Sequence, residues 1–480
     1  MKRIYKLMLF SILTLGMTAC DFDTENFQQI PTDEAYKSVQ DIQNGMNGAY
    51  YALGSYRFLG NYAVAYGDFC GGVSNGSSST GHFYYQSNWI ISDTDAELED
   101  MWYYGLQVVD RTTRTIAGAK DVLAKAESLF LTEKDIADIN LYMGQCYALK
   151  ALANYYLINL FGKPYHIGTD NMGLPLVKEE PIEPFTKIDR SNILQTYEQI
   201  TSDITNAETC LNEATQVVSE PNAFYMGSMG LQALKARVYM SLGEYSIAEG
   251  AAKKAIELKG KGDGTGNDNI PSDEIYVSMW TSLAITDEDL FTIAKTEADN
   301  LSANSLNTLY GSYGATLTNS TIALYENNDI RKGLLNGTKT LKYQGLPTSA
   351  ATSNIPIFRK SEMSLILAEI YTRQNNLPLA QNYLLYTAKR NKDITSIADL
   401  PTTQADLLQF ISEERIREFS GEGHRFYDAR RMGDKVALVG YEPFDIQQFV
   451  FPIPAAEINA GYMTQQNEGW DNNLPVSTAN

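Results

Sequence analysis

The sequence has few of the side chains on which metal and redox chemistry depends. Its 480 residues include three histidines, four cysteines and four tryptophans. It has no His-x-x-x-His pair, no Cys-x-x-Cys pair and no Walker-type phosphate loop, which are the usual sequence signals of zinc and nucleotide sites. We therefore predict that the protein holds no metal and needs no cofactor.

Positive charge is also scarce in this sequence. There are 38 lysines and arginines against 58 aspartates and glutamates, which gives a formal net charge of −20. Such a chain is repelled by the phosphates of nucleic acids and by anionic lipid. We predict no nucleic-acid partner, and attachment to a membrane through something other than charge.

The N-terminal segment is organised like an export signal. A basic start, MKR, precedes the thirteen-residue apolar run 7–19, which is too short to span a bilayer. Cys20 follows the run directly and resembles the lipobox of bacterial lipoproteins, although Met17 stands where leucine is usual. We predict a signal peptide over 1–19, lipidation of Cys20 and a tether over 20–32. The alternative is an ordinary secretory signal followed by a chance cysteine.

Helical periodicity dominates the rest of the chain, because apolar residues recur at three- and four-residue spacing. The pattern predicts helices over 33–56, 95–128, 132–161, 190–213, 222–242, 244–258, 357–375, 377–390 and 404–419. The remaining three cysteines include Cys146 and Cys210, which both lie in helical patterns. We predict that they are buried thiols, with a disulfide between them as the alternative.

Two of the predicted helix pairs have the spacing of tetratricopeptide hairpins. Small residues at fixed intervals let two antiparallel helices approach closely. The matching positions are Ala236, Tyr239, Ala248 and Ala255 in the first pair, and Ala368, Tyr371, Ala380 and Thr387 in the second. Long irregular stretches, rich in Gly, Ser, Asp and Asn, separate the pairs and also occur over 67–95.

One short stretch concentrates charge and contains one of the three histidines. It reads EFSGEGHRFYDARR, from Glu418 to Arg431. Gly421 and Gly423 allow two backbones to cross closely there, and charges buried at such a crossing must be paired. Catalysis would need His424 to face a nucleophile. We predict a structural cluster, formed by Arg415, Glu418, Glu422, His424, Arg425 and Asp428.

The same stretch resembles the C-terminal signature of the SusD/RagB family of outer-membrane nutrient-binding lipoproteins. The matching residues are Arg415, Glu418, Phe419, Glu422, Gly423, Arg425, Phe426, Asp428, Arg430 and Arg431. The closing motif of that family is matched by Pro452, Ile453, Pro454, Glu457, Ile458, Gln466, Asn467, Gly469 and Trp470. Asp329 and Arg331 look like its Asp-Arg segment. Ala460 and Gly461 depart from it, because Asn-Pro is common there.

The resemblance implies a mostly α fold. A tetratricopeptide-like superhelix of helix hairpins would pack against a loop-rich, irregular half that binds the ligand. Residues 33–480 would form a single unit, with an N-terminal region over about 33–260 and a C-terminal region over about 270–480. The acidic run DFDTE after Cys20 is similar to the surface-export signal of such lipoproteins.

The resemblance also implies a function. The protein would be a non-catalytic lipoprotein, anchored by its lipid in the outer membrane and exposed on the cell surface. It would bind oligosaccharide or polysaccharide nutrients and deliver them to a SusC-like TonB-dependent transporter. Some members bind peptide in place of glycan, so peptide is the alternative ligand. The alternative functions are a lipoprotein hydrolase and a pure assembly scaffold.

Sugar rings stack their C–H face on tyrosine or tryptophan, and their hydroxyl groups bind amides and charged side chains. Residue type and loop position give eight candidate ligand contacts: Tyr84, Tyr85, Asn88, Trp89, Trp280, Asn304, Tyr310 and Tyr313. The alternative for each ring is that it packs its loop onto the core. We assign Trp102 and Trp470 to packing.

Overall fold

The computed structural model describes residues 35–183, 186–269, 271–438, 440–461 and 465–475. The predicted signal peptide, Cys20 and the predicted tether lie outside the described residues. In the part of the chain that is described, no helix combines the length and the apolar character needed to cross a membrane.

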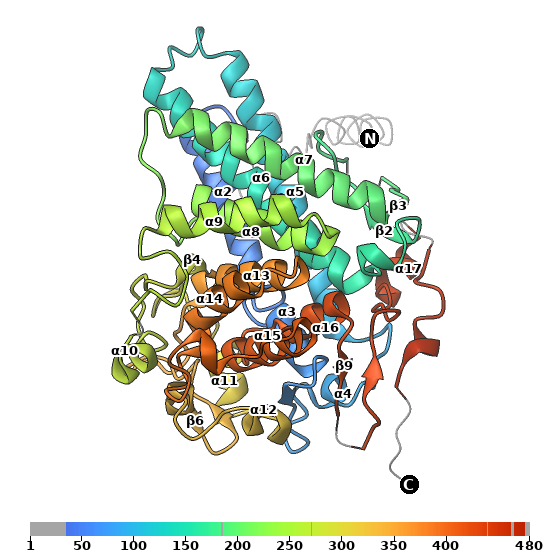
Figure 1. Cartoon of the computed structure of the whole chain (residues 1–480). Helices are drawn as coiled ribbons and strands as arrows, with labels where there is room; N and C mark the ends of the chain where they lie inside the picture. Colours follow the sequence, from blue (N-terminus) through green and yellow to red (C-terminus); the bar gives the residue numbers. More distant parts are fainter. Residues whose placement is uncertain (1–34, 184–185, 270, 439, 462–464, 476–480) are drawn as a thin grey trace, which may run out of the picture.

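The N-terminal half is a layer of long helices (Figure 1). It comprises α2 (Val39–Leu53), α5 (Ala96–Ala124), α6 (Glu133–Phe161) and α7 (Ile193–Ala214). Helix α6 begins at a capping box formed by Thr132 and Asp135. Most of its side chains are buried, because α2, α5 and α7 cover it. This explains why α6 is rich in alanine and other apolar residues on nearly every side.

Two helix hairpins follow, as the tetratricopeptide spacing predicts. They are α8 (Ser228–Leu242) with α9 (Tyr245–Lys259), and α13 (Lys360–Arg373) with α14 (Leu377–Ala388). Gly243 and Asn375 make the turns with positive φ angles of 76° and 59°. The alanines predicted at the hairpin contacts are all buried. Helix α9 also packs on α13, so the prediction of a mostly α fold built from such hairpins is confirmed.

The C-terminal region adds two helices that lie beside the second hairpin (Figure 1). They are α15 (Gln404–Phe419) and α16 (Arg425–Met432), separated by the glycine-containing turn of the charged stretch. Gly423, with a φ angle of 79°, lies directly against α3 (Tyr62–Phe69). This contact joins the charged stretch to the beginning of the chain.

Short elements make up the loop-rich half and the connections. The helices are α4 (Tyr84–Ser87), α10 (Asp273–Ser278), α11 (Leu306–Tyr310), α12 (Asn319–Ala323) and α17 (Ala455–Ala460); the strands are β1 (Ser74–Asn75), β2 (Met172–Pro175), β3 (Arg190–Asn192), β4 (Asp289–Ile293), β5 (Thr316–Leu317), β6 (Leu335–Asn336), β7 (Lys339–Thr340), β8 (Ile355–Arg359), β9 (Lys435–Val436) and β10 (Phe444–Asp445). Single turns of 3₁₀-helix cover Tyr165–Ile167, Ser302–Asn304, Ile330–Leu334, Ile397–Asp399 and Asp471–Asn473.

The strands form antiparallel pairs, and these correct some predicted helix ends. Strand β4 pairs with β8, so residues 355–359 are extended and the helix predicted from 357 begins at Lys360. Strand β2 pairs with β3, so the helix predicted from 190 begins at Ile193. Periodicity over one segment does not reveal a strand partner located elsewhere in the sequence.

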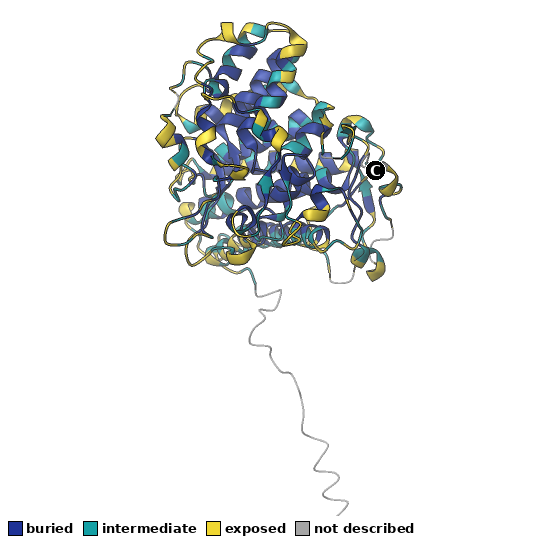
Figure 2. Ribbon diagram, turned by 90° about the horizontal axis from the view of Figure 1, so that it is seen from below, coloured by how far each residue is buried: buried dark blue, intermediate teal, exposed yellow. Residues whose placement is uncertain are grey.

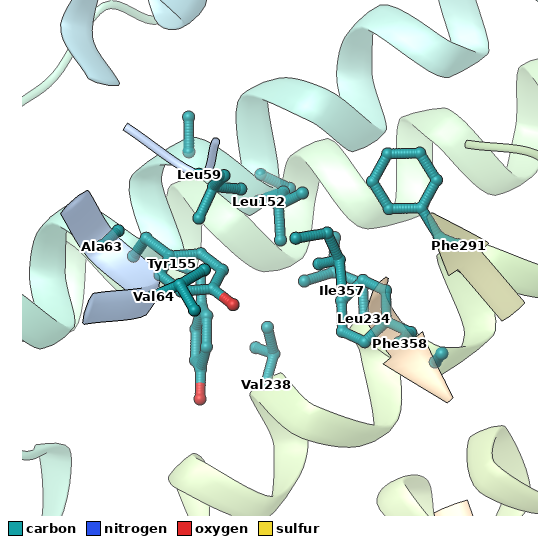
Figure 3. Close-up of a cluster of buried hydrophobic side chains, with 14 of the residues drawn as sticks. Leu59, Ala63, Val64, Leu152, Tyr155, Leu234, Val238, Phe291, Ile357 and Phe358 are labelled. Atoms are coloured by element: carbon teal, nitrogen blue, oxygen red, sulfur yellow. The ribbon is translucent and has the colours of Figure 1, made fainter. Parts of the chain in front are cut away.

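One hydrophobic core joins the helical and loop-rich halves (Figure 3). Leu152 of α6, Leu234 of α8 and Phe358 of β8 meet in it, and Val64 of α3 lies alongside. Buried residues fill the middle of the molecule, and exposed residues lie in loops, at the ends of helices and on the outer faces of surface helices (Figure 2).

The cysteines among the described residues are unpaired. Cys70, Cys146 and Cys210 are buried free thiols, so the alternative of a Cys146–Cys210 disulfide is wrong. Cys210 of α7 lies against Gly144 of α6, whereas Cys146 of α6 lies beside Thr115 of α5. Each behaves as a small apolar side chain at a helix contact.

Candidate ligand-binding surface

Two loops far apart in the sequence meet through a short strand pair. Ser74 of β1 lies opposite Leu317 of β5, and Asn75 lies opposite Thr316. Next to this pair, the hydroxyl of Thr80 donates to the carbonyl oxygen of Tyr313 at 2.8 Å. The residues after β1 and those before β5 therefore form one continuous surface.

Aromatic rings from both loops lie on this surface. The rings of His82 and Tyr313 stack with centroids 3.7 Å apart and planes 9° apart. Tyr84 and Tyr85 are 37% and 56% exposed, and their rings meet edge to face at 5.8 Å. We call this set, with Asn88, the aromatic surface. Its exposed rings have the faces on which the apolar side of a sugar ring stacks.

The half-buried Asn88 is held in place by its neighbours. Its side-chain amide donates to the carbonyl oxygen of Tyr84 at 2.7 Å, and its own carbonyl oxygen accepts from the hydroxyl of Tyr441 at 3.1 Å. These bonds fix the end of the short helix α4. The side-chain oxygen of Asn88 remains an acceptor that a hydroxylated ligand can use.

The aromatic surface thus collects four of the eight predicted contacts: Tyr84, Tyr85, Asn88 and Tyr313. Asn304 is exposed but lines a different hollow of the surface, at the end of α2. His82 was missed by the sequence analysis, which weighed histidine for metal binding and catalysis rather than for stacking. Its position two residues before Tyr84 was the available signal.

The structure corrects the prediction that Trp89 is exposed to a ligand on its loop. Its side chain is 3% exposed and packs against Phe444 and Phe449, at 5.1 and 4.7 Å between ring centroids. The φ angle of Trp89 is 55°. The backbone of Trp89 is therefore left-handed, and its indole lies inward although Tyr84 and Tyr85 of the same loop are exposed.

Trp280 and Tyr310 are corrected in the same way, because they are 7% and 2% exposed. The Trp280 ring lies under the cationic groups of Lys342 and Arg359, at 4.6 and 5.3 Å. Tyr310 is stacked between Phe69 and Tyr343. Both rings support the loops from beneath rather than facing solvent.

A buried carboxyl group lies beside Tyr310. Asp68 accepts a hydrogen bond from the backbone N–H of Gly423 at 3.1 Å and lies 3.5 Å from the hydroxyl of Tyr310. Burial raises the pKa of the Asp68 carboxyl to about 8, although the amide of Gly423 and the charge of Lys342 oppose the shift. Asp68 is therefore mainly protonated in the folded protein at neutral pH.

Asp68→Asn is expected to stabilise the protein in a pH-dependent way. The raised pKa in the folded state means that wild-type stability falls as pH rises from about 4, the unfolded value, towards 8. Asparagine has a similar shape and stays neutral at every pH, so the variant does not lose this stability as the pH rises. Urea unfolding should show the variant more stable by more than ~1 kcal/mol at pH 8, with the difference vanishing near pH 4. A difference independent of pH would contradict this assignment.

The charged stretch forms a buried ionic cluster centred on Glu418. This side chain is fully buried, and its oxygens contact Arg359 at 2.8 Å, Arg331 at 3.3 Å and also Arg390. Burial alone would raise the pKa of the Glu418 carboxyl, but these arginines hold it well below its usual range. The carboxylate is therefore ionised and bound from several directions, as a buried charge must be.

The other signature residues are paired in the same region. Glu422 receives two hydrogen bonds from Arg359, both 2.8 Å long, and contacts Lys342 at 2.6 Å. Two further ion pairs join Arg415 to Asp428 at 2.6 Å and Arg425 to Asp434 at 2.7 Å. Together these bonds connect α15, α16 and β8.

His424 packs against the end of α15. Its ring stacks on Phe419 at 4.3 Å. Burial and then the charges of Arg237 and Arg415 lower the pKa of His424 well below its usual value, so the ring is neutral. The nearby hydroxyl of Ser420 is bonded to Tyr325 at 2.6 Å.

The sequence contains the spacing of a hydrolase motif at strand β1. Residues 72–76 read Gly-Val-Ser-Asn-Gly, the spacing of the nucleophile elbow of α/β-hydrolases. Here Ser74 lies in strand β1, not in a turn between strand and helix. Its side chain is fully buried, and its hydroxyl is bonded to Tyr310 at 3.1 Å. The serine therefore supports the loop contact and is not presented to a substrate.

Comparison with known families gives two matches along the chain. The model of the SusD family matches residues 275–442. A second model, described as starch-binding and associating with the outer membrane, matches residues 73–240. Among curated proteins no match is found.

Solved structures share the fold over nearly the whole chain. A SusD superfamily protein from Bacteroides thetaiotaomicron has 24% identity and a TM-score of 0.75, covering 90% of this chain and 99% of its own. A SusD-like carbohydrate binding protein from Bacteroides vulgatus has 17% identity and a TM-score of 0.71, covering 89% and 98%. Surface glycan-binding protein A from Bacteroides fluxus has 20% identity and a TM-score of 0.65, covering 90% and 99%. Because SusD-type models match both halves of the chain, the protein belongs to the SusD/RagB family.

Proposed function

We propose that the protein is a non-catalytic, lipid-anchored binding protein of the outer-membrane surface. It holds oligosaccharides and passes them to a SusC-like TonB-dependent transporter. The observation that carries this proposal is the aromatic surface, where exposed rings from two distant loops share one face. The family supports it, since one matching model is described as starch-binding and outer-membrane-associated.

The chemistry of the surface suits sugar binding better than turnover. Tyr84, Tyr85 and the His82–Tyr313 pair offer faces for stacking, and Asn88 offers an amide at the edge. The signature carboxylates Glu418 and Asp428 are buried and already paired with arginines, Glu418 with Arg359 and Asp428 with Arg415. Two structures with the same fold are named carbohydrate- or glycan-binding proteins, which agrees with the proposal.

Tyr85→Ala is expected to weaken oligosaccharide binding about tenfold, because it removes one stacking face of the aromatic surface. Affinity electrophoresis against starch, xylan, pectin and mucin glycans selects the ligand, and isothermal titration then measures its affinity. Tyr103→Ala is the matched control, since Tyr103 is 58% exposed on α5 outside the aromatic surface. Equal affinities for wild type and Tyr85→Ala would argue against this site.

Three measurements distinguish this proposal from the alternative ligand and the alternative functions. The first is the same titration with peptides. Peptides that bind with the same dependence on Tyr85 would replace oligosaccharide as the ligand of this surface. Release of new reducing ends from a bound polysaccharide would show a hydrolase instead. Co-purification with a TonB-dependent transporter after membrane extraction would test the partner.

A further inference from the structure

A cavity of about 640 Å³ lies where the end of α2 faces the chain that follows β4. Its volume is typical of sites for small ligands. Its lining includes Tyr51, Tyr56, Tyr104 of α5 and Tyr225. Residues 293–295, 299–302 and 304 also line it. None of these residues belongs to the aromatic surface.

The tyrosines of the cavity differ in how firmly they are held. Tyr50 is fixed, because its hydroxyl donates to Gln145 and accepts from the backbone N–H of Met226, both at 2.7 Å. Tyr225 packs on it edge to face at 5.7 Å. Tyr51 and Tyr225 are 73% and 42% exposed, so they present ring faces to the cavity and to solvent.

Lys295 places a poorly satisfied charge in this cavity. Its side chain is 7% exposed, and its ammonium contacts Asp299 at 3.4 Å, while the carboxylate of Asp299 is 63% exposed. An ammonium has three donors, and a buried one normally has close partners. Among the described residues, this long contact is the one bond of the Lys295 ammonium. An anion in the cavity would supply what is missing.

Arg57 is the second cation of the cavity. Its guanidinium lies over the rings of Tyr56 and Tyr104, at 4.7 and 5.2 Å, and is oriented by bonds to Asp100 at 3.1 Å and to the Tyr104 hydroxyl at 2.8 Å. The lining therefore has two cations, Arg57 and Lys295, and one acid, Asp299. Arg57 is paired with Asp100 at 3.1 Å, whereas Lys295 has only its longer contact of 3.4 Å with Asp299, so Lys295 is the less satisfied cation of the two.

We propose that this cavity is a second binding site, which takes a sugar carrying a carboxylate, such as a uronic acid. The carboxylate binds the ammonium of Lys295, and the sugar ring lies on Tyr51 or Tyr225. Arg57, the other cation of the lining, receives a second acidic unit of the same chain. The proposal rests on the proposed function in that the ligand is a glycan, and it adds the class of glycan.

Trigalacturonic acid and its trimethyl ester are the probes, because they differ in charge and hardly in shape. Isothermal titration should show the acid binding at least about tenfold more tightly than the ester. Lys295→Met should remove this preference, and Lys254→Met, which changes an exposed lysine of α9, should keep it. Equal binding of acid and ester to the wild type would overturn the proposal.

Asp299→Asn gives a result of the opposite sign. It removes the carboxylate that competes for Lys295, so trigalacturonate should bind severalfold more tightly to this variant. A purely structural Lys295–Asp299 pair would not produce tighter binding, and weaker binding would overturn the proposal. Melting temperatures confirm that both variants are folded.

Two further outcomes would show which part of the proposal is wrong, the binding site or the chemical class of the ligand. If Tyr85→Ala abolishes trigalacturonate binding while Lys295→Met leaves it unchanged, the acid binds the aromatic surface; the cavity proposal then fails and the proposed function stands. If a sulfated disaccharide binds through Lys295 and trigalacturonate does not, the assignment of a carboxylate is overturned.

Discussion

Glu418→Gln is expected to lower the free energy of unfolding by about 4 kcal/mol or more, the size found when one partner of a buried ion pair is removed. The substitution keeps the shape of the side chain and removes its charge. Arg331, Arg359 and Arg390 would then lie close together without the carboxylate that they share. Because natural domains are stable by only about 5–15 kcal/mol, much of the protein should be recovered unfolded or aggregated.

Glu413→Gln is the matched control for this prediction. Glu413 lies on the same helix, but it is 36% exposed and 3.8 Å from its partner Arg417. Exposed ion pairs contribute at most about 1 kcal/mol, so this variant should unfold close to the wild-type midpoint in urea. Similar midpoints for Glu418→Gln and Glu413→Gln would show that the buried cluster does not hold the fold together.

Gly67→Ala should be comparably damaging, with a loss of about 3 kcal/mol or more. A Cβ atom at Gly67 would lie 1.9 Å from the carbonyl oxygen of Gly423, closer than any real contact. The obstructing atoms belong to the backbone of Gly423 and cannot rotate away as a side chain could. Helix α3 and the turn of the charged stretch would therefore have to separate. That separation would also disturb the bond from Gly423 to Asp68. Thermal unfolding of the purified variant measures the effect.

Gly250→Ala is the control, and its expected effect has the opposite sign. Gly250 lies within α9 with nothing within 4 Å of its added Cβ. Alanine favours a helix over glycine by about 1 kcal/mol, so this variant should be slightly more stable than the wild type. If Gly67→Ala unfolded at the same temperature as Gly250→Ala, the close backbone crossing would be disproved.

Most of the fold could be predicted from the sequence, because helices and hairpin contacts depend on local spacing. The small residues at Ala236, Ala248 and Ala368 are where the helices meet. Gly423 could also be identified as a crossing point. Its partner Gly67 could not, since the two glycines are 356 positions apart in the sequence and nothing local marks the contact.

The candidate site was harder to predict, because residue type and loop position do not fix the direction of a side chain. Tyr85 and Trp89 lie four residues apart in one loop, yet one is 56% and the other 3% exposed. The difference depends on the positive φ angle of Trp89 and on aromatic partners beyond residue 440. The cavity at Lys295 likewise requires α2, α5 and the segment after β4 to be brought together.

A glycan array probed with the mature protein tests the account most directly. The wild type and a Tyr84→Ala/Tyr85→Ala double variant are applied at the same concentration, and bound protein is measured on each glycan. We predict that every glycan that retains the wild type retains at least about tenfold less of the double variant, and that the thermal unfolding of the variant is unchanged. Equal retention of both proteins across the array would contradict it.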